Sequence, residues 1–327
     1  MCGAVFCFLC VFVKRGCDME LTKYEIFADA AKTGNFTKTA DRMGYTQPAV
    51  SRTLRLLEQE LGFPLFVRQK NGVELTSSGQ MILPYVRNLL AEEKLLAQQV
   101  SEIRGIHTGR LTIACFASVS RVLLPHFLAA FQASYPGIQV ELMEGGTDDI
   151  VRWVTENVAD FGILSHRHIG GLSWLSLWRD PLVAVVPREE PFLSMKAFPV
   201  EKMTAQPFIL SADGTDYDIH HMLSTTKIRP TIRFTSKDDH AIVSMVANHL
   251  GMSILPRLVV LDLAHLVRML PLAPAFDRTL GIAYKEKAAL TPAARKFIDQ
   301  IVKTDVSKIQ ELDGLEENAE MDMAMGE

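Results

Sequence analysis

The chain has 327 residues and a formal net charge of −4, and 48% of its residues are hydrophobic. This composition excludes a chain that is too short or too polar to bury a large core, so we expect two or more domains. The patterns described below predict an α+β multidomain fold with a helical N-terminal head, a long helix and an α/β C-terminal half.

Residues 1–18 differ in composition from the rest of the chain. The apolar run 4–13 is shorter than the roughly twenty residues that cross a bilayer. Its basic neighbours, Lys14 and Arg15, follow it instead of preceding it as they would in a secretory signal. We therefore expect a non-native or disordered extension, no membrane partner, and a functional chain that begins at Met19.

Four cysteines, Cys2, Cys7, Cys10 and Cys17, lie in this extension, and Cys115 is the fifth. The pair Cys7-x-x-Cys10 could open a metal site, but no second Cys or His pair follows at a suitable spacing. We predict no metal and no other cofactor. A lone cysteine in the remaining chain is typical of a reducing, cytoplasmic compartment without disulfides.

The stretch from Phe36 to Glu60 contains two short helical patterns with a tight break between them. Either Asn35 or Thr37 can cap the first pattern, and Gly44 permits the positive φ of a sharp helix exit. Its apolar residues recur at helical spacing: Phe36, Ala40 and Met43.

Thr46 can cap the second pattern, and Pro48 is tolerated there because first-turn N–H groups have no intrahelical partner. The expected buried stripe consists of Val50, Leu54, Leu57 and Leu61. Gln, Ser and Arg side chains, which suit the reading of base edges, occupy the other faces. The pattern indicates a helix-turn-helix, although an ordinary helical hairpin would also fit it.

Positive charge is concentrated around these helices. From residue 32 to residue 70, seven Lys and Arg residues stand against three acidic residues, a local net charge of +4. An earlier helix, Leu21 to Ala31, is expected to end at Gly34. Val67 to Leu75 predicts a hairpin with its turn at Asn71-Gly72 and a basic tip. Local charge of this kind favours a nucleic-acid-binding face, and a solvated surface hairpin is the alternative.

Residues 20–80 resemble the winged helix-turn-helix domain of the LysR-type transcriptional regulators. The ordered, ungapped match comprises Phe27, Gly34-Asn35-Phe36, Ala40, Thr46-Gln47-Pro48-Ala49-Val50-Ser51, Leu57-Glu58, Leu61-Gly62, Leu65-Phe66-x-Arg68 and Leu75-Thr76-x-x-Gly79. The resemblance implies a DNA-binding domain at 19–76 whose second helix enters the major groove of double-stranded promoter DNA. The residues then expected to read bases are Gln47, Pro48, Ser51 and Arg52. Those expected to contact phosphates are Thr37, Thr46, Arg55 and Arg68.

Thr76 is expected to cap a long linker helix at 77–105, with a kink at Pro84. Apolar residues at steps of four and three form a heptad seam: Ile82, Val86, Leu89, Leu96, Val100 and Ile103. Such a seam could pack on its own domain, but after a DNA-binding head it favours dimerisation. The resemblance implies the same use, in a homodimer or a homotetramer made of two dimers.

Short apolar strands alternate with helical patterns after residues 105–109, which indicates an α/β fold. Ser236-Lys237-Asp238-Asp239 has the form of a capping box at the start of one helix. The expected strands are 111–116, 138–143, 161–164, 182–186, 252–255 and 279–284, and the expected helices are 118–134, 148–157, 236–249 and 292–302.

This order resembles the effector domain of the same family, which has the type II periplasmic-binding-protein fold. The matching stretches are Leu124-Pro125, Tyr135-Pro136-Gly137, Asp160-Phe161-Gly162, Asp180-Pro181-Leu182, Pro207-Phe208-Ile209 and Leu250-Gly251-Met252-Ser253-Ile254-Leu255-Pro256. The resemblance implies a regulatory domain at 110–303, with two crossing strands that join subdomain I (110–163 and 267–303) to subdomain II (164–266). A small-molecule effector would bind in the cleft between the subdomains.

Phe116 to Ser120 ends a strand and opens a helix, and so presents free N–H groups, a positive dipole end and two hydroxyls. This suits a carboxylate or another anion, although the hydroxyls could serve only as caps. Asp213 and Asp239 of the facing subdomain would suit an amine or a hydroxyl, which leaves an effector of mixed polarity open. The expected effector-binding residues are Phe116, Ala117, Ser118, Ser120, Ser165, Asp213, Gly214, Asp239 and His240.

Other groups favour no further chemistry. His166-x-His168 and His220-His221 lack acidic or cysteine partners at metal-binding spacing, and Cys115 is more typical of a small core residue than of a thiol switch. Because no nucleophile–base pair or phosphate loop is present, we predict that the protein is not an enzyme. The acidic segment 304–327 predicts a disordered tail.

The sequence therefore favours a ligand-responsive, cytoplasmic DNA-binding regulator. Its expected partners are promoter DNA, a small effector and further copies of itself, with RNA polymerase as a candidate partner. A solute-binding protein built on residues 110–303 alone would leave the basic head unexplained, and an enzyme would lack catalytic groups.

Overall fold

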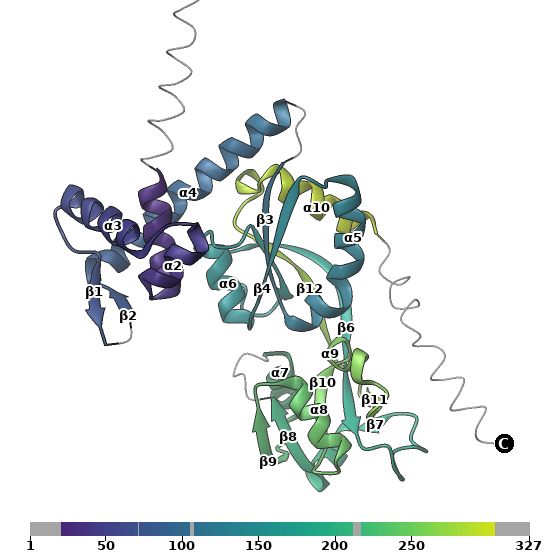
Figure 1. Cartoon of the computed structure of the whole chain (residues 1–327). Coiled ribbons are helices and arrows are strands. Elements are labelled where there is room, and N and C mark those ends of the chain that lie inside the picture. The colour runs from purple at the N-terminus through teal and green to yellow at the C-terminus, as the bar shows by residue number, and fades with distance from the viewer. Residues whose placement is uncertain (1–20, 71, 105–107, 212–216, 305–327) are drawn as a thin grey trace, which may run out of the picture. The chain divides into compact units, whose positions relative to one another are not determined.

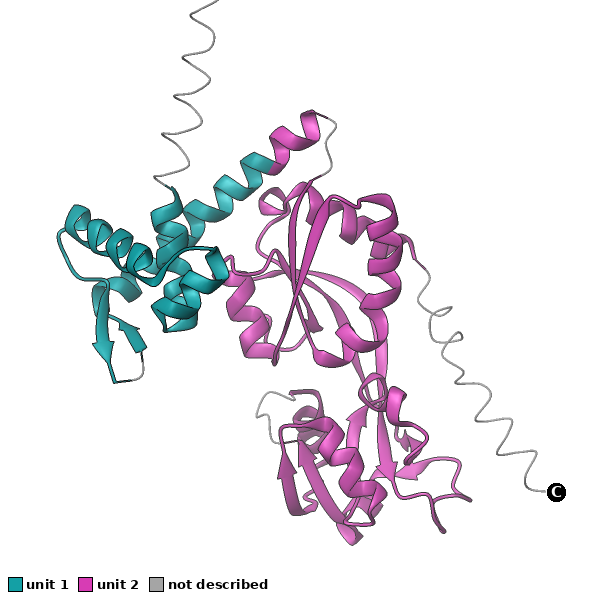
Figure 2. Cartoon of the chain, in the orientation of Figure 1, with its two compact units in different colours: residues 1–97 teal, residues 98–327 magenta. Residues whose placement is uncertain are grey.

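The computed structural model describes residues 21–70, 72–104, 108–211 and 217–304. The chain divides into two compact units, Met1–Ala97 and Gln98–Glu327, which Figure 2 draws in two colours. We call the described part of the first unit the head and that of the second the C-terminal unit. The predicted extension at 1–18, and the predicted tail beyond Thr304, lie outside the described residues.

The head is built from helices and a small hairpin (Figure 1). A helix that includes residues 21–33 precedes α2 (Phe36–Met43) and α3 (Gln47–Leu61), and the hairpin consists of β1 (Phe66–Gln69) and β2 (Gly72–Leu75). One core joins these elements, and its most deeply buried residues include Phe27, Ala30, Ala40, Val50, Leu54, Leu57 and Leu65. The predicted inward stripes are confirmed, with Phe36, Met43 and Leu61 only partly buried.

Local chemistry fixes the ends of α2 and α3. Asn35, and not Thr37, caps α2: its side-chain oxygen accepts two first-turn N–H groups, at 2.8 and 3.2 Å. Gly44 leaves α2 with a φ of +72°, a conformation that a side chain would strain. Thr46 caps α3 by accepting a hydrogen bond from the Ala49 N–H at 3.4 Å. The predicted helix-turn-helix is present.

Gly72 has a different role from the predicted one. The expected turn is Asn71-Gly72, but Gln69 pairs with Gly72, which places Gly72 in β2; Asn71 lies outside the described residues. A Cβ on Gly72 would lie 2.3 Å from the carbonyl oxygen of Gly34. The Val73 N–H donates to that same oxygen at 2.8 Å. Glycine is required because β2 docks directly on the end of the first helix.

The predicted long helix is α4 (Ser77–Ile103), which includes residues of both units and continues through Pro84. Thr76 caps it by accepting a hydrogen bond from the Gly79 N–H at 2.9 Å. The predicted seam divides along the helix. Ile82 and Val86 pack in the core of the head, because the first turns of α4 complete that core. The later seam residues are exposed: Leu89, Leu96, Val100 and Ile103.

A mixed sheet organises the C-terminal unit in the order β4-β3-β5-β12-β6-β11-β7, with β10 also paired to β6. Its strands are β3 (Gly109–Cys115), β4 (Ile138–Glu144), β5 (Phe161–Ser165), β6 (Ser173–Val186), β7 (Phe198–Pro199), β10 (Ser253–Pro256), β11 (Arg268–Ala273) and β12 (Asp277–Tyr284). The predicted strand 182–186 is only the end of β6. The earlier part of β6 is mostly half-buried and lacks a continuous apolar run, so it carries no clear strand signal.

Two separate cores divide this unit into lobes. Lobe 1 contains β3, β4, β5 and β12, with the π-helical turn η1 (Val119–Leu123), α5 (Leu124–Ser134), α6 (Thr147–Thr155) and α10 (Pro292–Lys303). Lobe 2 contains β7, β10 and β11, with β8 (Pro207–Ser211), β9 (Thr231–Ser236), α7 (Tyr217–Thr226), α8 (Asp239–Ala247) and α9 (Arg257–Val260). Strand β6 pairs with β12 through its first part and with β10 and β11 through its last residues, so it belongs to both lobes (Figure 1).

The start of α8 differs from the prediction. The N-cap is Asp238, whose carboxylate accepts the N–H groups of His240 and Ala241. Ser236 instead accepts the N–H of Asp238 at 3.1 Å. The predicted capping box is therefore displaced by two residues, because an Asp–Asp pair offers a charged acceptor directly before the first turn.

Candidate DNA interface and effector site

The side chains expected to read bases lie on the first two turns of α3. Gln47, Pro48 and Arg52 are exposed and Ser51 is half-buried, while Val50 and Leu54 of the same turns are buried. The apolar stripe therefore holds the helix against the head and leaves the polar face in solvent. A helix that presents this face can enter a major groove.

The residues expected to contact phosphates are also exposed: Thr37, Thr46, Arg55 and Arg68. The ion pairs in the described part of the head include Lys23 with Glu60 and Arg42 with Asp29. Arg52, Arg55 and Arg68 form no ion pair with any described residue. Their charge is therefore available to an anion outside the protein, such as a phosphate.

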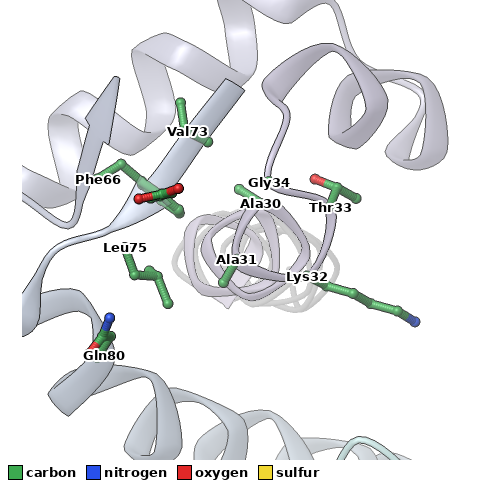
Figure 3. Close-up of a pocket in the computed structure, with 10 residues that line it drawn as sticks. Ala30, Ala31, Lys32, Thr33, Gly34, Phe66, Val73, Leu75 and Gln80 are labelled. Carbon is green, nitrogen blue, oxygen red and sulfur yellow. The ribbon is translucent and has the colours of Figure 1, made fainter. Parts of the chain in front are cut away.

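The head also contains a hollow of about 430 Å³ between the end of the first helix and the hairpin (Figure 3). Its lining residues are Ala30, Ala31, Lys32, Thr33, Gly34, Phe66, Val73, Glu74, Leu75 and Gln80. None of the residues expected to contact DNA lines it, and the Lys32 side chain extends away from it in Figure 3. The hollow is thus separate from the proposed groove-reading face.

In the C-terminal unit, the predicted strand-to-helix turn is formed by residues 116–120. Phe116 is half-buried, Ala117 is exposed and Ser118 is buried. Ser118 makes no capping hydrogen bond. The hydroxyl of Ser120 donates to the Ala117 carbonyl at 2.9 Å and to the Glu144 carboxylate. The two hydroxyls therefore differ: the Ser120 hydroxyl is bonded to the Ala117 carbonyl and the Glu144 carboxylate, whereas the Ser118 hydroxyl makes no capping bond.

Ser165 ends β5, and its hydroxyl donates to the Asp218 carboxylate of α7 at 3.0 Å. The same oxygen accepts the Arg167 Nε–H at 2.9 Å. Asp218 is only 6% exposed. Its buried negative charge is stabilised by the Arg167 guanidinium and by the Ser165 hydroxyl. This contact joins lobe 1 to lobe 2.

Asp239 and His240 begin α8 on the lobe 2 side. Burial raises the pKa of Asp239, and the positive charges of Arg278 and Arg121 act in the opposite direction. Its Oδ1 accepts the Ser211 hydroxyl at 3.4 Å. His240 contacts Arg121 of lobe 1 and lies 3.6 Å from a carboxylate oxygen of Asp262. Asp213 and Gly214, the other two expected residues, lie outside the described residues.

Arg278, which sequence reasoning missed, lies among these groups. It is 6% exposed on β12 and forms an ion pair with Asp180 of β6, with Nη2 and Oδ2 2.8 Å apart. Its Nη2 also donates to Ser118 Oγ at 3.3 Å. The sequence did offer a signal. Arg278 directly precedes the apolar strand 279–284, and Asp180 precedes the apolar strand 182–186, so a charged residue stands at the start of each.

The remaining candidates have structural partners. His166 meets the edge of Trp174, with ring centroids 5.1 Å apart, and His168 stacks on Tyr217 at 3.9 Å. Burial, with a smaller contribution from Glu144, raises the pKa of Cys115 to about 12, so its thiol stays protonated at neutral pH. Among the described residues, no group of three or more His, Cys, Asp or Glu could hold a metal ion.

Two protein families match most of the chain. Residues 21–80 match the bacterial regulatory helix-turn-helix protein of the lysR family, and residues 104–305 match the LysR substrate binding domain. The chain belongs to the LysR family of transcriptional regulators. The uncharacterized HTH-type transcriptional regulator YybE of Bacillus subtilis is 26% identical over 287 residues, which cover 87% of this chain and 98% of the relative. None of the described helices has the length and apolar character needed to cross a membrane.

Solved LysR-type structures share the fold. A full-length variant of OxyR from Pseudomonas aeruginosa has a TM-score of 0.66 and 23% identity, covering 88% of this chain and 98% of its own. Full-length CbnR complexed with its target DNA has a TM-score of 0.61 and 20% identity, covering 86% and 98%. The effector binding domain of QuiR in complex with shikimate has a TM-score of 0.55 and 23% identity, covering 60% and 96%.

Proposed function

We propose that this LysR-type regulator binds promoter DNA by placing α3 in the major groove. The observation that supports this most directly is the polar face of α3, on which Gln47 and Arg52 are exposed while Val50 and Leu54 anchor the helix. Further support comes from CbnR, a protein of the same fold whose structure is solved with its target DNA. Within the interface, Gln47, Pro48, Ser51 and Arg52 read bases, and Thr37, Thr46, Arg55 and Arg68 position the backbone.

The active form is a homodimer that pairs through α4, and two dimers join into a tetramer. Support comes from the apolar residues that the head leaves exposed on this helix: Met81, Tyr85, Leu89, Leu96, Val100 and Ile103. A second copy of the helix would remove this surface from water. RNA polymerase is the further partner expected of a cytoplasmic regulator that acts at promoters.

A small effector binds between lobe 1 and lobe 2, and the protein is not an enzyme. The predicted boundary at residue 267 moves toward the C-terminus, because Val267, Leu270 and Leu272 pack in the core of lobe 2. Support comes from the buried polar groups that meet there from both lobes, among them Ser118, Ser165, Asp218 and Arg278. The shikimate complex of QuiR gives a related domain with a small carboxylic acid bound. Binding shifts the population of lobe arrangements and, through the dimers, the geometry of the bound DNA.

The test is a gel-shift titration on genomic fragments that chromatin mapping identifies as bound by this protein. We expect specific fragments to bind at least 10³-fold more tightly than unrelated DNA, and affinity to fall steeply as salt rises. Binding without any sequence preference at every salt concentration would contradict the proposal. Matched titrations of the Arg68→Ala variant should show a uniform loss on all fragments, because a phosphate contact carries no sequence information.

A further inference from the structure

Arg278 is held rigidly at the place where the lobes join. Its register partner across β12 and β6 is Asp180. The guanidinium donates to Asp180 Oδ2 from Nε at 2.9 Å, and the other carboxylate oxygen accepts the Leu258 N–H at 3.0 Å. Both oxygens of the acid are therefore in use, and the buried pair cannot swing away without breaking three contacts.

The guanidinium still has donors to offer. Nη2 reaches Ser118 Oγ at 3.3 Å, and the plane lies over the Phe116 ring, 5.2 Å from its centroid. Within the described residues, Nη1 donates no hydrogen bond, and it is not among the fully buried side-chain atoms that lack a partner. Nη1 is therefore a charged donor that solvent can reach, and an acceptor that enters here can take its hydrogen bond.

Backbone donors stand beside this edge of Arg278. Residues 117–134 form one continuous helical run, and the N–H groups of Ala117 and Ser118 have no acceptor among the described residues. First-turn N–H groups attract anions. Ala117 is exposed, so a molecule from solvent can reach them. An arginine and two backbone amides together offer donors that suit a carboxylate.

An acidic group faces the same region from lobe 2. Asp239 opens α8, and among the described side chains its hydrogen-bond partner is the Ser211 hydroxyl at 3.4 Å. Burial raises the pKa of Asp239, and the positive charges of Arg278 and Arg121 act to lower it, but Asp239 forms no ion pair with either arginine within the described residues. An acid and an arginine that interact electrostatically without forming an ion pair are suitable partners for the two ends of a molecule that carries both charges.

We propose that the effector is an amino acid whose carboxylate binds Arg278, Ser118 and the amides of residues 117–118, and whose ammonium group binds Asp239. The two ends of one zwitterion would then contact both lobes and hold them together. This inference rests on the proposed effector role of the region between the lobes, and it adds the chemical class of the ligand.

The experiment measures binding to the full chain by calorimetry and thermal unfolding. The probes are the twenty standard amino acids, each with its decarboxylated amine and its deaminated acid. We expect at least one amino acid to bind, and both of its truncated counterparts to bind at least tenfold more weakly. The proposal is overturned if no amino acid binds at 10 mM, roughly the weakest affinity that still reports on a specific site, or if a truncated counterpart binds as tightly.

Variants separate a direct contact from a general effect. Arg278→Lys keeps the charge but loses the planar fork, and Asp239→Asn keeps the shape but loses the charge. Each should weaken binding of the amino acid at least tenfold. Arg179→Lys and Asp277→Asn alter an exposed pair on the same two strands, whose N–O distance is 3.8 Å, and should bind normally. Unchanged affinity in Asp239→Asn would reject the ammonium contact.

A gel shift on promoter DNA without amino acid keeps this inference separate from the proposed function. If the wild-type chain recognises specific DNA but no amino acid binds, only the ligand class is wrong. If the wild-type chain has no DNA preference, the proposed regulator function itself fails.

Discussion

The two functional regions of this molecule use polar residues in opposite ways. On α3, Arg52 and Arg55 are exposed and pair with no described residue, so they are ready for an external partner. Between the lobes, Arg278 and Asp180 are buried and bind each other. Polar groups on α3 should therefore affect binding and leave stability unchanged, whereas polar groups between the lobes should affect stability first.

The largest effect is expected when the buried pair is broken. Asp180→Ala leaves the Arg278 guanidinium and the Leu258 N–H without their acceptor, and should destabilise the C-terminal unit by about 3–5 kcal/mol. Urea unfolding of the full chain measures this. Asp277→Ala removes an exposed acid that pairs with Arg179 and should change stability by about 0–1 kcal/mol. An equal loss of unfolding free energy in Asp180→Ala and Asp277→Ala would mean that the buried ion pair contributes no more to stability than the exposed one.

Truncation of a charged side chain on α3 should change DNA affinity instead of stability. Arg52→Ala should lower specific affinity by about 1–3 kcal/mol and relax the preference at one operator position, while the free energy of unfolding stays within about 0.5 kcal/mol. Gel shifts on a set of operators with single base-pair changes measure both. An unchanged preference at every position would reject the base-reading role. Arg55→Ala, in contrast, should weaken all operators alike.

Distance along the chain explains which of these regions the sequence could predict. The head is assembled from caps, glycines and an apolar stripe that act over a few residues, as with Asn35, Gly44 and Thr46. The contacts between the lobes join residues far apart: Arg278 bonds Ser118 across 160 positions, and Arg121 meets His240 across 119. No local pattern indicates such pairs, so Arg278 was missed.

Strands without a strong period were missed for a related reason. Strand β9 is almost entirely exposed and has no buried alternation. The early part of β6 is half-buried along most of its length. Their pairing is decided by neighbouring strands in the sheet, and single-sequence periodicity reports burial instead of pairing. The deeply buried β5 and β10 were predicted because every residue of each faces a core.

A smaller effect should decide between two possible caps of α2. Asn35→Ala removes the acceptor of two first-turn N–H groups and should destabilise the head by about 1 kcal/mol. Thr37→Ala changes the alternative cap, whose exposed side chain plays no capping role, and should stay within about 0.5 kcal/mol. Urea unfolding of both full-length variants checks this, and a larger loss in Thr37→Ala would reverse the assignment.

The smallest expected effect concerns Asp239 and depends on pH. Burial raises the pKa of this carboxyl above its ordinary value of 3.8, so between 3.8 and the raised pKa the folded state binds more protons than the unfolded state. Stability must then fall as pH rises through that window, and the full penalty is present above it. Asp239→Asn keeps an acceptor for the Ser211 hydroxyl but carries no charge, and should be the more stable protein at neutral pH.

That gain should shrink as pH falls through the window, because the wild-type carboxyl becomes protonated and loses its penalty. Urea unfolding of both proteins from pH 7 to pH 4 measures the difference. Asp277→Asn, which removes an exposed carboxylate, controls for the general effect of losing one negative charge. A gain in Asp239→Asn that stays constant across the window, or that grows toward acid, would place Asp239 with the exposed acids. A gain that fades toward acid would instead show that an uncompensated carboxylate is maintained between the lobes at neutral pH, where it opposes folding and remains free to meet a cation.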